Sequence, residues 1–167
     1  MLWIESSLKD LFNGSRDAFP ATKMREHATH TVRVEHLKWV PFLGVGTLFV
    51  KATVKNEGRK HESIMLFKGV GYGDEKGRIP LMDSSGRKVF LKRLSEADGD
   101  VLVRCSCGDF FNRFNYYNSL DGSLFGRKRK KYEGKGLWEA NPKGLPGMCK
   151  HLMKLTVVLK ESGLLAN

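Results

Sequence analysis

Apolar and polar residues alternate along the middle of the chain, which is the pattern of β-strands that bury one face. The alternation begins at Thr31 and returns in "GTLFVKATVKNEG" at residues 46–58, which contains four β-branched residues, two valines and two threonines. A turn-like stretch, "NEGRKH" at 56–61, then leads into the segment "ESIMLFKGVGYG", which starts at Glu62 and is mostly apolar from Ile64 to Phe67. We therefore predict two neighbouring strands joined as a hairpin in this region.

Two later segments continue the strand pattern. They are "RKVFLKRL" at 87–94 and "DVLVRCSC" at 100–107, and a polar turn separates them. The glycine-rich stretch "GVGYG" at 69–73 precedes both segments, but its spacing misses the common phosphate-binding fingerprints and no helix signal follows it. A glycine-kinked strand end is therefore favoured there over a nucleotide site. Together these segments predict an antiparallel sheet of four to six strands.

The two ends of the chain have a helical period instead. Apolar residues near the start predict a short helix from about Glu5 to Asn13, ended by Gly14. Residues 21–30 can form a second short helix, although their threonine and histidine content opposes it. Near the other end, "MCKHLMKLTVVLKESGLL" at 148–165 has apolar residues at three- and four-residue steps and a glycine placed to end the helix. The predicted fold class is α+β, an antiparallel sheet with a short N-terminal helix and a C-terminal helix.

Positive charge changes the functional picture. The 167 residues include 29 Lys and Arg against 18 Asp and Glu, a formal net charge of +11. The excess is concentrated after residue 100, and its densest part is a run of five residues: Arg127, Lys128, Arg129, Lys130 and Lys131. Like charges in such a run repel one another unless an anion screens them, so we expect the run to bind nucleic acid or an acidic partner.

The composition also bears on location. The hydrophobic content of 41% is enough to fill the core of one domain. The first residues, "MLWIESSLKDLFNG", lack the basic leader of a signal peptide, and no apolar run approaches the about 20 residues of a membrane span. We expect an intracellular (cytoplasmic) or virion protein that is not secreted and has no membrane partner. Cysteines in such reducing surroundings are not expected to form structural disulfides.

The three cysteines of the chain fall in two close pairs, and a histidine completes the second pair: Cys105 with Cys107, and Cys149 with His151. Zinc prefers four sulfur or imidazole ligands in a tetrahedron. Residues two apart in a strand point to the same face, and the second pair lies where the final helix begins. Burial of the cysteines as small apolar residues is the alternative, but the matching spacing favours a metal. Four protein ligands leave no open position for water, which favours a structural zinc site over a hydrolytic one.

This arrangement of Cys-x-Cys, a spacer and Cys-x-His resembles the SWIM zinc finger over residues 105–151. The resemblance implies Zn²⁺ as the cofactor, a short β-hairpin that carries the first pair and a helix that carries the second. The 41 residues between Cys107 and Cys149 exceed the usual spacer of that family, so residues 108–148 form a long insertion rich in aromatic and basic residues. "CSCGDFFNRFNYYN" together with "NPKGLPGMCKHL" is also similar to uncharacterised proteins of tailed bacteriophages.

The sequence thus predicts two parts, an N-terminal helix and β region at residues 1–100 and a SWIM-like zinc module at 101–167. We expect a non-enzymatic structural or adaptor protein that contacts other protein chains of a large assembly such as a phage virion. DNA or RNA binding through the basic insertion is the alternative function. The aromatic residues of the insertion can stack on bases or pack as core, and we favour packing as core. His27 and His30 suit a surface better than a second metal site. No catalytic arrangement of serine, histidine and carboxylate is recognisable, so we expect no enzyme and no small-molecule substrate.

Overall fold

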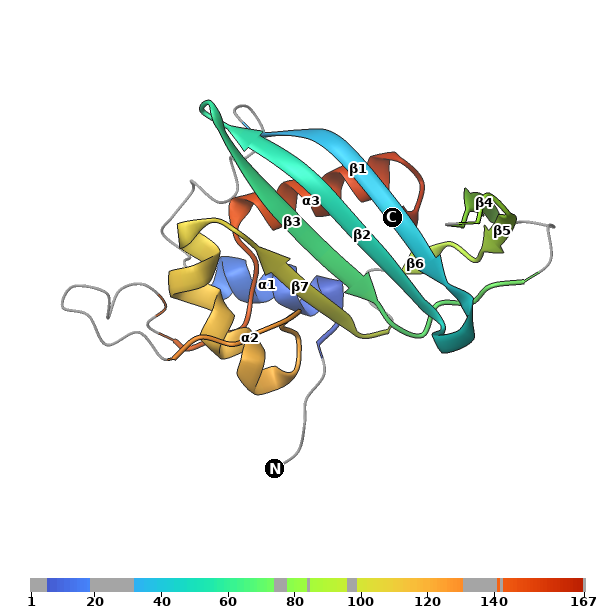
Figure 1. Cartoon of the computed structure of the whole chain (residues 1–167). Coiled ribbons are helices and arrows are strands. Elements are labelled where there is room, and N and C mark those ends of the chain that lie inside the picture. The colour runs from blue at the N-terminus through green and yellow to red at the C-terminus, as the bar shows by residue number, and fades with distance from the viewer. Residues whose placement is uncertain are drawn as a thin grey trace.

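A computed structural model describes residues 6–18, 32–73, 78–83, 85–95, 99–130, 141 and 143–166. Four antiparallel strands form its main sheet in the spatial order β1 (Val32–Phe42), β2 (Thr47–Asn56), β3 (Arg59–Phe67) and β7 (Val101–Cys105). Two helices, α1 (Leu8–Ala18) and α3 (Lys150–Glu161), lie on one face of this sheet (Figure 1). This mixture of helices and antiparallel sheet confirms the predicted α+β class.

The predicted hairpin is the β2–β3 pair. The chain turns at Glu57 and Gly58, whose φ angles of 50° and 82° are the left-handed values that a tight hairpin turn requires. Burial alternates residue by residue along β2, so that one face carries a fully buried apolar row: Leu48, Val50, Ala52 and Val54. We call this the inner face, because it packs against the helices.

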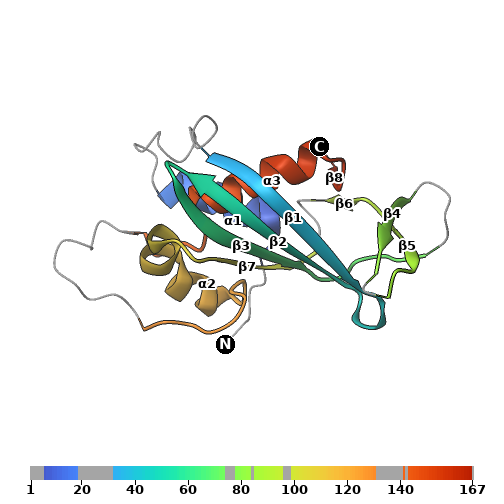
Figure 2. The same ribbon diagram turned by 45° about the horizontal axis from the view of Figure 1, so that its top comes forward.

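Two small sheets lie outside the main one. β4 (Ile79–Met82) pairs antiparallel with β5 (Lys88–Leu91), and β6 (Leu94–Ser95) pairs in parallel with β8 (Leu165–Ala166). The predicted strand at 87–94 is therefore divided between two small sheets, because the exposed pair Lys92 and Arg93 interrupts it. Figures 1 and 2 both place β4 and β5 at the opposite end of the main sheet from α2 (Asn115–Asp121).

The glycine-rich stretch after β3 carries the chain from the main sheet to the small one. β3 ends at Phe67, Gly69 has a φ of 65°, and Tyr72 forms a β-bridge with Leu91. The Tyr72 hydroxyl donates a hydrogen bond to the carbonyl of Thr47 at 2.6 Å. The stretch is a kinked strand connection, as the spacing of its glycines predicts.

Helix α3 supplies the centre of the core. Leu152, Leu155 and Leu159 follow the predicted helical period and are fully buried. Gly163 has a φ of 84° just after the helix, and Leu164 then returns into the core, which confirms the predicted helix end. No described helix is both long enough and apolar enough to pass through a bilayer.

The insertion contains helical structure that the sequence pattern did not predict. A wide helical turn of π geometry, η2 (Phe110–Phe114), runs directly into α2. Phe110 and Phe114 are fully buried, which confirms that these aromatic residues pack as core, whereas Phe111 remains 44% exposed. The division of the chain at residue 100 stays a prediction; the main sheet takes strands from both sides of that position.

Helix α1 differs from its prediction at both ends. It begins after Ser7, whose hydroxyl accepts a hydrogen bond from the backbone N–H of Asp10 at 3.2 Å as an N-cap. It then continues through Gly14 to Ala18 instead of ending at the glycine. The glycine serves close packing, because a Cβ at this position would overlap the carbonyl oxygen of Pro146. The possible second helix at 21–30 and the pair His27 and His30 lie outside the described residues.

Replacing Gly14 by alanine tests this packing. In an open helix the change would stabilise the fold by about 0.5–1 kcal/mol. Here we expect a loss of about 1–3 kcal/mol, because α1 must move away from the backbone at Pro146. Urea unfolding measures the difference, and Asn13→Ala, at an exposed position of the same helix, is the matched control that should change stability little. Stabilisation by Gly14→Ala would show that the close approach is absent.

Candidate metal centre

The four predicted ligands meet where β7 ends and α3 begins. Cys105 is the last residue of β7 and Cys107 lies just before η2, while Cys149 is the N-cap residue of α3 and His151 lies in its first turn. All four side chains are at most 3% exposed. Two segments separated by 41 residues in the sequence thus converge on one enclosed point.

The spacing of the donor atoms fits one tetrahedral ion. The three sulfurs and one imidazole nitrogen all lie within 4.8 Å of one another. Nδ1 of His151 is 3.7 Å from Sγ of Cys105 and 3.8 Å from Sγ of Cys149. A tetrahedral zinc ion with ordinary bond lengths separates sulfur and nitrogen ligands by about 3.6 Å. The cluster is therefore able to hold one metal ion.

Charge within the cluster also suits a cation. The thiols of Cys107 and Cys149 donate hydrogen bonds toward the sulfur of Cys105 and lower the pKa of Cys105 to about 4. Burial, followed by the neighbouring sulfurs, raises the pKa of Cys149 well above its ordinary value. The cluster alone thus stabilises one thiolate beside neutral thiols, whereas a bound dication would allow all three sulfurs to ionise.

Neighbouring groups orient the ligands. The backbone N–H of Phe110 donates to Sγ of Cys107 at 3.3 Å, and the hydroxyl of Ser63 donates to Sγ of Cys105 at 3.5 Å. Such hydrogen bonds reduce the charge that three thiolates place on a metal site. The ring of His61, which is half-buried, lies against that of His151, with 4.5 Å between the centroids.

Sequence reasoning did not find Ser63 or His61. Both lie on β3, and Ser63 is directly opposite Cys105 in the register of β3 and β7. The alternation of β3 places His61 on the same face as Ser63. A correct register for this strand pair would have identified both residues, but the 33 residues between the two strands hide it from a local pattern.

The structure divides the basic run. Arg127, Lys128 and Lys130 have exposed side chains, and Lys131 lies outside the described residues. Arg129 is half-buried: its guanidinium lies 4.0 Å from the centroid of the Phe111 ring and donates to Oδ1 of Asn112 at 2.6 Å. The structure thus uses Arg129 to attach the run to η2, and leaves the other three described cations open to solvent.

Two further side chains hold the same segment in an extended conformation. Nη1 of Arg104 donates to the carbonyl oxygens of Phe125 and Arg127, at 3.2 and 2.9 Å. Oδ1 of Asn115, a buried residue of α2, accepts a hydrogen bond from the backbone N–H of Arg129 at 2.8 Å. Arg104 and Cys105 are consecutive in β7, so their side chains lie on opposite faces of the sheet. The guanidinium of Arg104 therefore contacts the basic segment and not the sulfurs.

No protein-family model matches this chain, and neither a curated protein nor a solved structure shows significant similarity to it. The resemblance to SWIM zinc fingers is therefore carried by the four ligands and their spacing. The helix that this resemblance implies for the second ligand pair agrees with the structure, because Cys149 and His151 lie at the start of α3. The first pair differs in its setting, since Cys105 ends a strand of the main sheet that pairs with β3 and not a separate small hairpin.

The attachment of the basic segment is testable with two asparagines of one helix. Asn115→Ala removes the acceptor for Arg129, and we expect trypsin to cut after residues 127–130 about tenfold faster, the effect of losing a hydrogen bond of about 1–1.5 kcal/mol. Asn118→Ala is the matched control, because this equally buried side chain instead bonds the N–H and carbonyl of Gly147. Mass spectrometry of the first fragments locates the cuts. Equal cleavage of the two variants would show that Asn115 does not hold the segment.

Proposed function

We propose that the protein binds one Zn²⁺ through Cys105, Cys107, Cys149 and His151, and that the ion has a structural role. The observation that carries this proposal is the convergence of four buried donors, all within 4.8 Å of one another, at the junction of β7 and α3. Three sulfurs and one imidazole form a donor set that binds zinc in preference to magnesium or calcium. The SWIM-like order of the ligands supports the same ion.

A zinc ion held in this way closes the base of the insertion. Four protein ligands complete a tetrahedron and leave no position for water or substrate, which supports a non-enzymatic role. The ion would join the end of the sheet to the helix that supplies the core. Its contribution is then to the stability of the fold and to the placement of residues 108–130.

We propose further that the protein is an adaptor in a larger assembly such as a phage virion, where it contacts other protein chains. Several large apolar side chains are exposed at the end of the molecule remote from the metal centre, among them Phe42 at 47%, Val45 at 74% and Met82 at 61%. Exposed apolar groups of this size suit burial against another protein. The virion setting rests only on the resemblance to tailed-phage proteins noted in the sequence of the cysteine-containing segments.

DNA or RNA binding is the second proposal. It is favoured by the exposed side chains of Arg127, Lys128 and Lys130 on a segment that other residues already hold in place. A cationic segment fixed before binding loses less conformational entropy when it meets phosphates than a mobile one does. The net charge of +11 adds to the attraction.

Metal removal tests the zinc proposal. We expect about one zinc per chain in the purified protein by elemental analysis, and a lower melting temperature after chelation. Cys107→Ser should abolish zinc retention, because it removes one thiolate from the tetrahedron. Ser106→Ala, an exposed position between the two cysteines, is the control that should retain the metal. A metal-free protein whose melting is unchanged by chelator would exclude a structural zinc.

Purification from the native source separates the two partner proposals. An adaptor should elute with defined protein chains, and these should remain bound after nuclease treatment. A nucleic-acid-binding protein should instead lose its co-purifying material when nuclease is added. Elution as a free single chain with neither partner would contradict both.

A further inference from the structure

One face of the main sheet has no described helix on it. Figures 1 and 2 show α1 and α3 on the inner face and leave the other side of β1, β2, β3 and β7 uncovered by described elements. We call this the outer face. The strand registers determine its rows, because residues directly opposite one another in neighbouring strands project to the same side.

One row of the outer face is cationic. Lys38 of β1 is opposite Lys51 of β2, which is opposite Ile64 of β3, which is opposite Arg104 of β7. Three of these four positions carry a positive charge, and the row crosses the whole sheet, a distance of about 15 Å at the usual strand spacing. Sequence reasoning did not single out Lys38 or Lys51, because they belong to different strands and only the register unites them.

The adjacent row is apolar. It consists of Val40, Phe49, Leu66 and Leu102, one from each strand, and all four are half-buried where no described helix covers them. The ring of Phe125, from the segment after α2, extends this row and lies 5.8 Å from that of Phe49, centroid to centroid. The outer face thus presents a line of cations beside a line of apolar and aromatic side chains.

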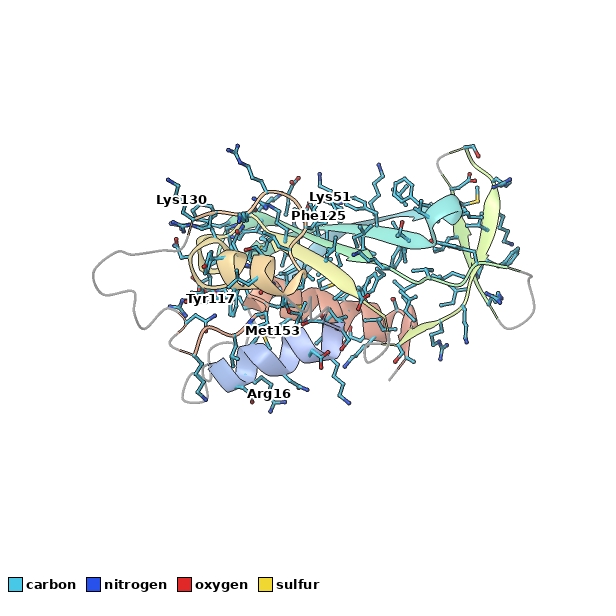
Figure 3. All side chains as sticks on the ribbon, turned by 90° about the horizontal axis from the view of Figure 1, so that it is seen from below. Arg16, Lys51, Tyr117, Phe125, Lys130 and Met153 are labelled. Carbon is cyan, nitrogen blue, oxygen red and sulfur yellow. The ribbon has the colours of Figure 1, made fainter. Side chains whose placement is uncertain are left out.

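The cationic row continues into the basic segment. Arg104 ends the row on the sheet, and its guanidinium bonds the carbonyls of Phe125 and Arg127. Exposed Lys128 and Lys130 follow along the same extended segment. Figure 3 shows Lys51, Phe125 and Lys130 on one side of the molecule, with Arg16 on the opposite side.

Two of the described carboxylates near this surface pair with lysines. Glu62 pairs with Lys51 at 3.2 Å, and Glu35 pairs with Lys60 at 3.3 Å. Lys38, Lys128 and Lys130 have no acidic partner among the described residues. Because Lys51 and Glu62 are both well exposed, their pair contributes little, and a phosphate can replace the carboxylate.

We propose that the outer face and the basic segment form one binding surface for single-stranded nucleic acid. The strand would cross the sheet with its phosphates along the cationic row and its bases against the apolar row that Phe49 and Phe125 share. A duplex hides its bases in the stack and meets only the cations, whereas an unpaired strand satisfies both rows. This inference rests on the second proposed function and extends the surface from the insertion to β1.

Salt dependence of binding tests the surface at its far end. The probe is a single-stranded oligonucleotide of about 20 nucleotides, longer than the about 4–16 that one OB-fold domain covers. Each phosphate contact contributes about 0.7 to the slope of log affinity against log salt for single strands. We expect Lys38→Gln and Lys128→Gln each to lower the slope by about that amount. Arg16→Gln, which removes the same charge from the opposite side, should leave it unchanged.

The duplex of the same sequence gives the second measurement. We expect it to bind about tenfold more weakly than the single strand, which corresponds to the loss of about one base contact. Melting curves of the three variants confirm that each is folded. Lys38 and Lys128 are exposed, so neither change is expected to disturb the core.

The outcomes distinguish the inference from the function on which it rests. If the unmodified protein binds neither the single strand nor the duplex, both the proposed surface and the proposed nucleic-acid binding fail. Binding to polyglutamate would then assign the basic segment to an acidic protein partner. If Lys128→Gln lowers the slope and Lys38→Gln does not, nucleic-acid binding stands but the sheet is not part of the surface. Equal affinity for single strand and duplex would overturn the role of the apolar row.

Discussion

The meeting of β7 with the first turn of α3 is the constraint on which the rest of the structure depends. Helix α3 supplies the centre of the core, yet 41 residues separate the two pairs of ligands. The ligand atoms of the two pairs, Cys105 with Cys107 and Cys149 with His151, nevertheless lie within 4.8 Å of one another. Three buried sulfurs at that distance are costly to ionise together without a compensating charge, and a zinc ion at their centre would offset that cost.

The approach to this junction is fixed from both sides by close packing. Gly147 lies between α1 and η2, where a Cβ would be 2.6 Å from Oγ of Ser15 and 2.8 Å from the Phe114 ring. Ser15 also accepts a hydrogen bond from the N–H of Met148 at 2.6 Å, and Asn118 bonds Gly147 from α2. The N-terminal helix thus helps to position Cys149, although the two are far apart in the sequence. This explains why α1 continues through Gly14, the position at which a helix end was predicted.

The two faces of the sheet divide the roles of the residues. The inner face carries the apolar core and, at its end, the metal ligands, while the outer face carries cations and half-buried apolar side chains. Alternation within β7 makes this division sharp, because Cys105 points inward and its neighbour Arg104 points outward to the basic segment. A single strand therefore connects the metal centre to the segment that the insertion exposes.

Local signals in the sequence were sufficient for the α+β class, the β2–β3 hairpin, α3 with its glycine end, and the four metal-ligand candidates. These features depend on alternation, helical period, turn residues and short spacings, all of which act over a few residues. The identity of the ion and the SWIM and phage relationships stay predictions, since no comparison supports them. The sequence also predicted a basic run as one feature, which the structure divides between exposed cations and an internal contact.

Only the tertiary structure decided the remaining features, because they depend on pairs of residues that are distant in the chain. The continuation of α1 through Gly14 follows from its contact with Pro146, which no propensity encodes. The cationic row that joins Lys38 to Arg104 exists only through strand register, and Ser63 reaches Cys105 for the same reason. The sequence by itself determined the strands of the main sheet, the C-terminal helix and which side chains are suited to bind a metal. The tertiary structure decided which faces those segments share, because strand pairing and close packing join residues that local patterns cannot relate.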